Sequence, residues 1–271
     1  MRYQTIGFIG CGNMGGALAR CAAKNLIGFE RILLSDVDAA KMRALCDATG
    51  AEASDNRTIG RRCDLIFLAI KPQMLAEVLE GIRSDLRART DRFVLLSMVA
   101  GVPICRVLEL SGRDAPIIRI MPNTPVSMGE GMVQYCHQGC APEEVEAFLA
   151  LLQGAGLFDE LPEHLIDAAS AVSGCGTAYL CLALEGMADG GVALGLPRDK
   201  ALRYAAQTIA GLGKLALQSG LHPGVLKDQV TSPGGTTIQG VRALENYRTR
   251  AAFFEAVIAS YEKTESLKQS T

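Results

Sequence analysis

TIGFIGCGNMG, residues 5–15, decides the fold. Its first five residues are mostly apolar or β-branched, as in a buried strand, and its last six match G-x-G-x-x-G and open a helical pattern. In such a turn the first glycine permits a tight bend, the second leaves room for a pyrophosphate, and the third allows close helix–strand packing. This order predicts a dinucleotide site, against the alternative of a merely structural turn, with contacts from Gly10, Gly12, Asn13, Met14 and Gly15.

Up to about Leu161 the chain alternates short apolar runs with amphipathic segments, which is typical of βαβ units around a mainly parallel sheet. The runs expected to be strands are 5–9, 31–35, 64–70, 92–97, 117–121, 131–136 and 156–161. The segments expected to be helices between them are 14–24, 39–49, 73–85, 103–110 and 142–152. The first part of the chain is therefore predicted to be a Rossmann-type, doubly wound α/β domain over residues 1–162.

After Pro162 the strand pattern ends, and long helical stretches rich in Ala, Leu and Gly follow over 166–194, 197–218 and 248–267. Residues 163–271 are therefore expected to form an all-helical domain. The stretch 178–195 is apolar on most faces, with small residues that permit close helix approach. This favours a dimer core of interlocked subunits, although a bundle within one chain would hide the same faces.

Composition narrows the class of protein. Hydrophobic residues make up 49% and charged residues 21% of the 271 residues, as in a folded globular protein. The formal net charge of −2, without a Lys/Arg-rich run, argues against nucleic-acid and anionic-membrane partners. No apolar leader precedes the first strand, so a cytoplasmic location is expected. The charge-free stretch 168–184 approaches the length of a membrane span, but its polar and glycine residues predict a buried helix start with a polar turn.

The nine cysteines are odd in number and scattered without paired spacing, which favours reduced thiols over a disulfide framework. Cys136, His137 and Cys140 are a weak candidate for a metal site, because no second ligand pair follows. A strand end and a turn explain them better, and no metal is expected.

The second strand ends at Ser35 and Asp36, and both are candidate cofactor-binding residues. Asp36 follows Gly15 by 21 residues, where an acidic side chain bonds the adenosine ribose hydroxyls. A carboxylate there repels a 2′-phosphate, so NADH is favoured over NADPH. Arg57 and Lys41 would offset that repulsion, and Asp36 would alternatively only cap the next helix.

Three further motifs carry a resemblance: AIKP at 69–72, MPNTP at 121–125, and HPGVLKD at 222–228 running on to SPGGTT at 232–237. With the opening turn, they make almost the whole chain resemble pyrroline-5-carboxylate reductases. The resemblance implies a Rossmann domain, a helical dimerisation domain, homo-oligomers built from dimers, and NADPH or NADH as cofactor. It implies hydride transfer to the C=N bond of 1-pyrroline-5-carboxylate, a cyclic imine carboxylate, giving L-proline. It gives the nicotinamide cofactor these further residues: Asn56, Ala69, Lys71, Pro72, Ala100 and Gly101.

One departure from the family pattern falls at SGCGTAY, residues 173–179, where the family usually has SGSGPAY. Loss of a proline at a helix start should cost little because the glycines still shape the turn. Ser173 is retained as a substrate-binding candidate.

The residues of the 232–237 loop predict a carboxylate pocket independently of the family resemblance. Pro233 fixes its entry, the two glycines let backbone N–H groups point inward, and a helix starting near Thr236 adds its positive end. The residues expected to bind substrate there are Ser232, Gly234, Gly235, Thr236 and Thr237. Thr237, the candidate catalytic residue, is expected to hydrogen-bond the ring nitrogen, against the alternative that it only lines the helix start.

Other functions share parts of this sequence pattern. The β-hydroxyacid dehydrogenases share the opening turn, but they carry a lysine where this chain has Leu180. A reductase of a modified pyrroline carboxylate and a non-catalytic dinucleotide sensor remain as alternatives. Hydride transfer mainly requires that two reactants be aligned and water excluded, and it needs no strong nucleophile. This agrees with a chain that has only three histidines and no recognisable Ser/His/Asp arrangement.

Overall fold

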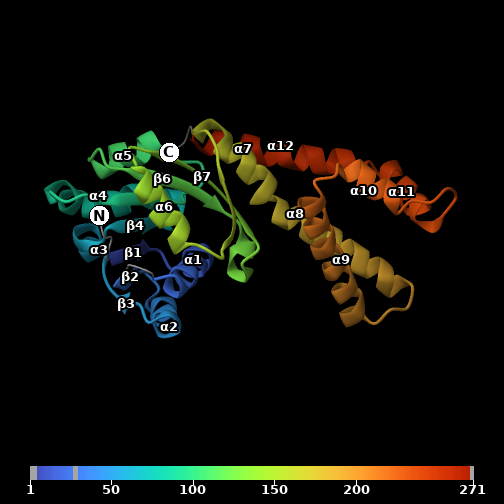
Figure 1. The fold of residues 1–271 in the computed structure, drawn as a ribbon, viewed down its shortest axis with the longest axis horizontal. Coiled ribbons are helices and arrows are strands. Elements are labelled where there is room, and N and C mark those ends of the chain that lie inside the picture. Colours follow the sequence, from blue (N-terminus) through green and yellow to red (C-terminus); the bar gives the residue numbers. More distant parts are fainter. Residues whose placement is uncertain (1–4, 27–29, 269–271) are drawn as a thin grey trace. The chain divides into compact units, whose positions relative to one another are not determined.

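The structure is a computed structural model that describes residues 5–26 and 30–268. It divides into two compact units. The first contains the chain up to Gly174 and again from Tyr261, and the second is Cys175–Ser260. Figure 1 shows the succession of elements along the chain.

The first unit is built on one eight-stranded sheet in the order β3-β2-β1-β4-β5-β6-β7-β8. All neighbouring pairs are parallel except β6 and β7, which are antiparallel. The central strands are apolar on both faces, as expected of a parallel sheet covered on both sides. The strands are β1 (Thr5–Ile9), β2 (Arg31–Ser35), β3 (Glu52–Ala53), β4 (Leu65–Leu68), β5 (Val94–Ser97), β6 (Ile117–Pro122), β7 (Gly131–Gln138) and β8 (Gly156–Glu160).

Helices cover both faces of this sheet and bury a core on each. One core is shared with α1 (Asn13–Lys24), α2 (Ala39–Thr49) and α6 (Pro142–Leu151). The other is shared with α3 (Asn56–Arg62), α4 (Leu75–Ala88), α5 (Ile104–Ser111) and α7 (Glu163–Ser173). Two short 3-10 turns, η1 (Pro72–Met74) and η2 (Thr124–Met128), follow β4 and β6.

The second unit is helical throughout its length. Helices α8 and α9 pack together around Ala188, Ala201 and Ala205. Its helices are α8 (Gly176–Ala193), α9 (Arg198–Ser219), α10 (Pro223–Gln229), α11 (Thr236–Asn246) and the first part of α12 (Thr249–Lys268). The expected Rossmann-type sheet followed by a helical region is confirmed.

All seven expected strands are present, with bounds that differ by at most a few residues. The sequence reading missed β3 and α3. The first is only two residues long. The second is a seven-residue helix whose signal was Asp55, which accepts hydrogen bonds from the N–H and hydroxyl of Thr58 as an N-cap.

The helical stretch expected over 166–194 is two helices, α7 and α8, separated at Gly174 and Cys175. Helix α7 packs on β6 and β7 and so belongs to the first unit, whose first segment runs to Gly174. The polar turn expected within residues 168–184 is present, and it lies between these two helices.

The second unit leaves large apolar side chains open to solvent, contrary to the expectation that 168–184 is buried and to a bundle that closes on itself. Leu182 and Leu217 are each 71% exposed, and Leu212 is 54% exposed. The stretch Glu163–Ala193 is long and apolar enough to cross a membrane by length and composition, with 17% of its apolar window buried in the chain. Exposed apolar area of this extent marks an interaction surface.

Candidate functional site

The glycines of the opening turn serve different purposes. Gly10 has a φ of +104°, and a Cβ there would overlap the carbonyl oxygen of Ala69. A Cβ on Gly15 would overlap the carbonyl of Gly10. Gly12 has an ordinary φ of −64°, and a Cβ there would meet no atom within 4 Å. Nothing in the chain itself requires a glycine at position 12, so the open space fits a ligand that approaches the backbone.

A groove of about 970 Å³ begins at this turn and runs along α1. Its lining includes Arg20, Lys24 and Lys41, and, within the described residues, no acidic side chain. Burial and then the Asp36 carboxylate raise the pKa of the Cys11 thiol at the turn to about 12, so the thiol is neutral. Helix α1 has no side chain capping its N-terminus. These charges suit the phosphates of a dinucleotide.

The end of β2 brings together three of the predicted cofactor residues. The Ser35 hydroxyl donates to Asn56 Oδ1 at 2.7 Å. Asp36 accepts from the Cys11 N–H at 2.5 Å and from the Asp38 N–H at 2.8 Å. Both carboxylate oxygens are thus fixed at the edge of the glycine turn by main-chain donors. Asp36 does not cap α2, because Asp38 holds that position.

The two cations expected to offset Asp36 are both held by other carboxylates. Arg57 donates to Asp85 at 2.8 and 3.2 Å, and Lys41 lies 3.5 Å from Asp38. The hydrogen bond from Arg57 lowers the pKa of Asp85 below its ordinary value, so this pair is charged at neutral pH. In the structure, these two cations are therefore paired with carboxylates other than Asp36.

The remaining predicted cofactor residues follow the carboxyl ends of β4 and β5. Ala69 contacts the glycine turn and donates its N–H to Ile9. Lys71 is exposed and caps the turn η1 with its carbonyl oxygen, ahead of Pro72. Ala100 and Gly101 lie in the turn after β5, where Gly101 has a φ of +71°. All predicted cofactor residues thus lie in the first unit, at or beyond the carboxyl ends of β1, β2, β4 and β5, or at the start of α3.

Ser173 ends α7 in the first unit. Its hydroxyl is hydrogen-bonded to the Gln134 side-chain amide at 2.9 Å and to the Ala169 carbonyl at 3.0 Å. Asn123, from the MPNTP motif, donates to the Ser173 carbonyl at 3.1 Å and accepts from the Met132 N–H at 2.8 Å. This motif therefore has a structural role, joining β6, β7 and α7.

The predicted carboxylate pocket lies in the second unit and has the expected turn geometry. The Gly235 N–H donates to the Ser232 carbonyl at 3.0 Å, with Pro233 second and Gly234, at a φ of +69°, third. These are the features of a type II turn. Helix α11 begins at Thr236 with no side-chain cap, so its first N–H groups are available to an anion. The Thr237 side chain is exposed at this helix start.

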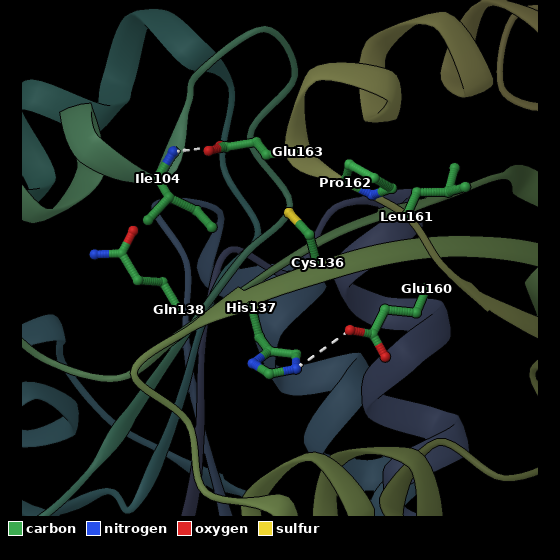
Figure 2. A pocket seen from close by; sticks show the side chains of 8 residues that line it. All are labelled: Ile104, Cys136, His137, Gln138, Glu160, Leu161, Pro162 and Glu163. Carbon is green, nitrogen blue, oxygen red and sulfur yellow. Dashed lines mark hydrogen bonds and ion pairs between the residues drawn. The ribbon is translucent and has the colours of Figure 1, made fainter.

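His222 has a structural contact: its Nδ1 accepts from the Gly224 N–H at 3.1 Å and caps α10. The Cys136–His137–Cys140 segment is the end of β7 followed by a turn at Gly139. Figure 2 shows Cys136 and His137 pointing to opposite sides of β7, with His137 directed at Glu160, 3.3 Å away. Over residues 5–26 and 30–268, no group of three or more His, Cys, Asp or Glu residues could hold a metal ion.

Sequence reasoning missed the partners that fix these side chains. Asp85 and Gln134 stand in no local motif, and Asp85, Asn123 and Gln134 each contact a residue at least nine positions away. Asn123 alone carried a signal, since it stands inside a motif.

Comparison with known proteins places this geometry in a family. The family model described as pyrroline-5-carboxylate reductase dimerisation matches residues 163–267, and the one described as NADP oxidoreductase coenzyme F420-dependent matches residues 5–101. The chain is 39% identical to the pyrroline-5-carboxylate reductase of Methanosarcina acetivorans, over 98% of this chain and 99% of the relative. It is 38% identical to that of Escherichia coli, with the same coverage.

Solved structures agree. The pyrroline carboxylate reductase of Plasmodium falciparum with NADP bound matches with a TM-score of 0.85 and 31% identity, covering 99% of each chain. The 1-pyrroline-5-carboxylate reductase of Streptococcus pyogenes matches with a TM-score of 0.87 and 25% identity, covering 98% of this chain and all of the other. The chain belongs to the pyrroline-5-carboxylate reductase family.

Proposed function

We propose that this chain is an NAD(P)H-dependent oxidoreductase that reduces 1-pyrroline-5-carboxylate to L-proline, the last step of proline biosynthesis. The family supports this reaction, since relatives named for it match the chain over nearly its whole length. The observation that carries the proposal is the type II turn at Ser232–Gly235 leading into the uncapped start of α11.

That turn suits the carboxylate of a small amino-acid-like substrate. Main-chain N–H groups at a helix start supply donors and a favourable dipole without a cationic side chain. Ser232, Gly234, Gly235, Thr236 and Thr237 form this pocket in the proposal. Ser173 is the other proposed substrate contact, although its hydroxyl is already hydrogen-bonded in the chain.

The chemistry needs alignment more than a reactive side chain. When bound, the reduced nicotinamide would supply a hydride ion, which carries two electrons, to the carbon of the protonated C=N bond. The nitrogen keeps its proton and becomes the secondary amine of proline. Thr237 orients the ring nitrogen by a hydrogen bond, because a hydroxyl both donates and accepts. The cofactor is held by the residues at and near the ends of β1, β2, β4 and β5 described above.

The functional unit in this proposal is a homodimer or a larger assembly of dimers. The apolar surface of the second unit and the match to the dimerisation model support this assignment. A second copy of the chain, not lipid, then covers α8 and α9. The same proposal gives the protein a cytoplasmic location and no nucleic-acid partner, in keeping with its net charge of −2.

The activity is tested by adding 1-pyrroline-5-carboxylate with NADH or NADPH and following the loss of nicotinamide absorbance. Oxidation of either cofactor together with formation of proline is expected. Oxidation only with methylated or hydroxylated pyrroline carboxylates would instead indicate a reductase of a modified ring. Cofactor binding without oxidation of any imine would indicate a dinucleotide sensor.

The role of Thr237 is tested by Thr237→Ala. Loss of the hydrogen bond to the ring nitrogen should lower kcat/KM for the imine by roughly a hundredfold. NADH affinity, followed by fluorescence, should be unchanged. Thr208→Ala is a matched control, because the Thr208 hydroxyl donates to the Tyr204 carbonyl within its own helix, α9, and has no proposed role in the site. Unchanged turnover in Thr237→Ala would remove the proposed role.

A further inference from the structure

The last turn of α12 lies against the loop that follows β5. A Cβ built on Gly101 would lie 3.5 Å from Thr264 Cγ2 and 3.7 Å from the Thr264 carbonyl oxygen. Both residues belong to the first unit. The C-terminal helix therefore supports the Ala100–Gly101 turn, although it lies far from this turn in sequence.

A chain of charged side chains joins the other end of this loop to the same helix turn. Glu163 Oε1 accepts from the Ile104 N–H at 2.7 Å, at the start of α5, as Figure 2 shows. The same oxygen lies 3.5 Å from Arg119 Nη1. Arg119 Nη2 donates to Asp167 Oδ1 at 2.6 Å, and Lys268 lies 2.8 Å from Asp167 Oδ2. The loop at residues 98–103 is thus held at Gly101 and, immediately after its end, at Ile104, and both sets of contacts lead to α12.

The network is buried at its centre and open at its ends. Arg119 and Asp167 are 1% and 3% exposed, whereas the Glu163 and Lys268 side chains are 35% and 28% exposed. Arg119 Nε is buried without a hydrogen-bond partner. Burying an ion pair costs desolvation free energy that apolar residues of similar size would avoid, so such a network is weak evidence for stability. It does fix the geometry of the elements it joins.

We infer that Lys268 and Asp167 are positioning residues for the nicotinamide end of the cofactor site. Through Arg119 and Glu163 they hold the start of α5, and with Thr264 they hold the Ala100–Gly101 turn, in the shape that receives the cofactor. The inference rests on the proposed function, because that function assigns Ala100 and Gly101 to the nicotinamide cofactor. Lys268 acts through other residues and does not contact substrate.

The test compares Lys268→Met with Lys263→Met in the full-length protein. Lys263 is an exposed residue of the same helix, so the control makes the same change of charge and shape. In Lys268→Met the Kd and KM for NADH or NADPH should rise roughly two- to thirtyfold, while KM for the imine and the molar mass of the assembly stay unchanged. Lys268→Arg, which retains the cation, should restore most of the affinity.

Cofactor binding is measured by nicotinamide fluorescence and needs no imine. A protein that binds NADH but does not reduce the imine would therefore refute the proposed reaction, while the comparison of Lys268 variants would still decide the positioning role. An equal rise in Kd for Lys263→Met, or a fall in thermal stability for Lys268→Met with unchanged cofactor affinity, would overturn it. So would wild-type protein that binds neither cofactor.

Discussion

At the scale of single residues, the glycines of the opening turn are of two kinds. Gly10 and Gly15 are required by the packing of the chain itself, whereas Gly12 leaves space for a ligand. A Cβ on Gly10 or Gly15 overlaps the protein's own backbone, whereas a Cβ on Gly12 meets nothing. A methyl group at position 12 therefore costs the folded chain little, and its steric cost appears when a pyrophosphate is bound.

Gly12→Ala and Gly15→Ala should consequently affect different properties, cofactor binding and stability respectively. Gly15→Ala should lower the free energy of unfolding by roughly 1–3 kcal/mol, the usual cost of an added methyl group in a packed region. Gly12→Ala should leave stability near that of the wild type and weaken NADH or NADPH binding by a similar free energy, roughly tenfold in Kd. Thermal unfolding and fluorescence titration measure the two effects. A large loss of stability in Gly12→Ala would contradict the assignment of that space to a ligand.

Asp36 should set the choice between the two cofactors. Its carboxylate is fixed by two main-chain donors, and Arg57 and Lys41 are held by other acids. We expect NADH to be preferred, and Asp36→Ser to raise the NADPH-to-NADH ratio of kcat/KM roughly tenfold by removing a screened repulsion. Asp47→Ser removes an exposed charge on α2 and should leave the ratio unchanged. A wild-type preference for NADPH would show that Asp36 does not decide it.

At the scale of elements, one short capped helix, α3, positions part of the cofactor site. Helix α3 is seven residues long and starts with Asn56, which bonds Ser35 at the end of β2. So short a helix depends on its cap and its packing, because isolated helices of this length do not form. The Asp55 cap therefore matters to both the fold and the adenosine side of the site.

Asp55→Ala should lower the free energy of unfolding at neutral pH by about 0.5–1 kcal/mol, at the low end for caps because Asp55 is exposed. The hydrogen bond from the Thr58 N–H lowers the pKa of Asp55. A carboxyl with a lowered folded-state pKa stabilises the fold above its unfolded value of about 3.9, and this contribution is lost as the pH falls through the folded-state pKa. Urea unfolding should therefore show a difference between variant and wild type at pH 7 that shrinks below about pH 4. A constant difference across this range would exclude the charged cap.

At the scale of the whole molecule, the second unit exposes too much apolar surface to be the finished assembly. Leu182 on α8 and Leu217 on α9 are among the most exposed leucines of the chain. Burial of apolar area is the main favourable term in subunit association, so a second copy covering these faces would stabilise the helices themselves.

Leu182→Asp should therefore dissociate the assembly or weaken it strongly, because it adds a charge to a surface that would lose its water. Light scattering after gel filtration measures the molar mass, and the absorbance assay measures the accompanying loss of activity. Leu157→Asp is the control, since Leu157 is 55% exposed on β8, outside the residues matched by the dimerisation model. An unchanged mass for Leu182→Asp, or an equal loss for Leu157→Asp, would remove α8 from the interface.

Much of the fold, and the two turns proposed to bind cofactor and substrate, were predictable from the sequence. The strand–turn–helix at residues 5–15, the alternation up to Leu161 and the helices after Pro162 are set by local spacing and by the periods of apolar residues. The bend at Ser232–Gly235 also follows from its own proline and glycines. These features involve neighbours in the chain, so the sequence by itself determined them.

Only the tertiary structure decided which side chains are hydrogen-bonded or ion-paired to distant residues of the chain. It joined Asp36 to the Cys11 N–H, Arg57 to Asp85, and Lys268 through Asp167 to the loop after β5. It also left the apolar faces of α8 and α9 uncovered within the chain. Such contacts link residues 25 to more than 100 positions apart, and no local pattern encodes them, because they depend on how strands and helices pack in space.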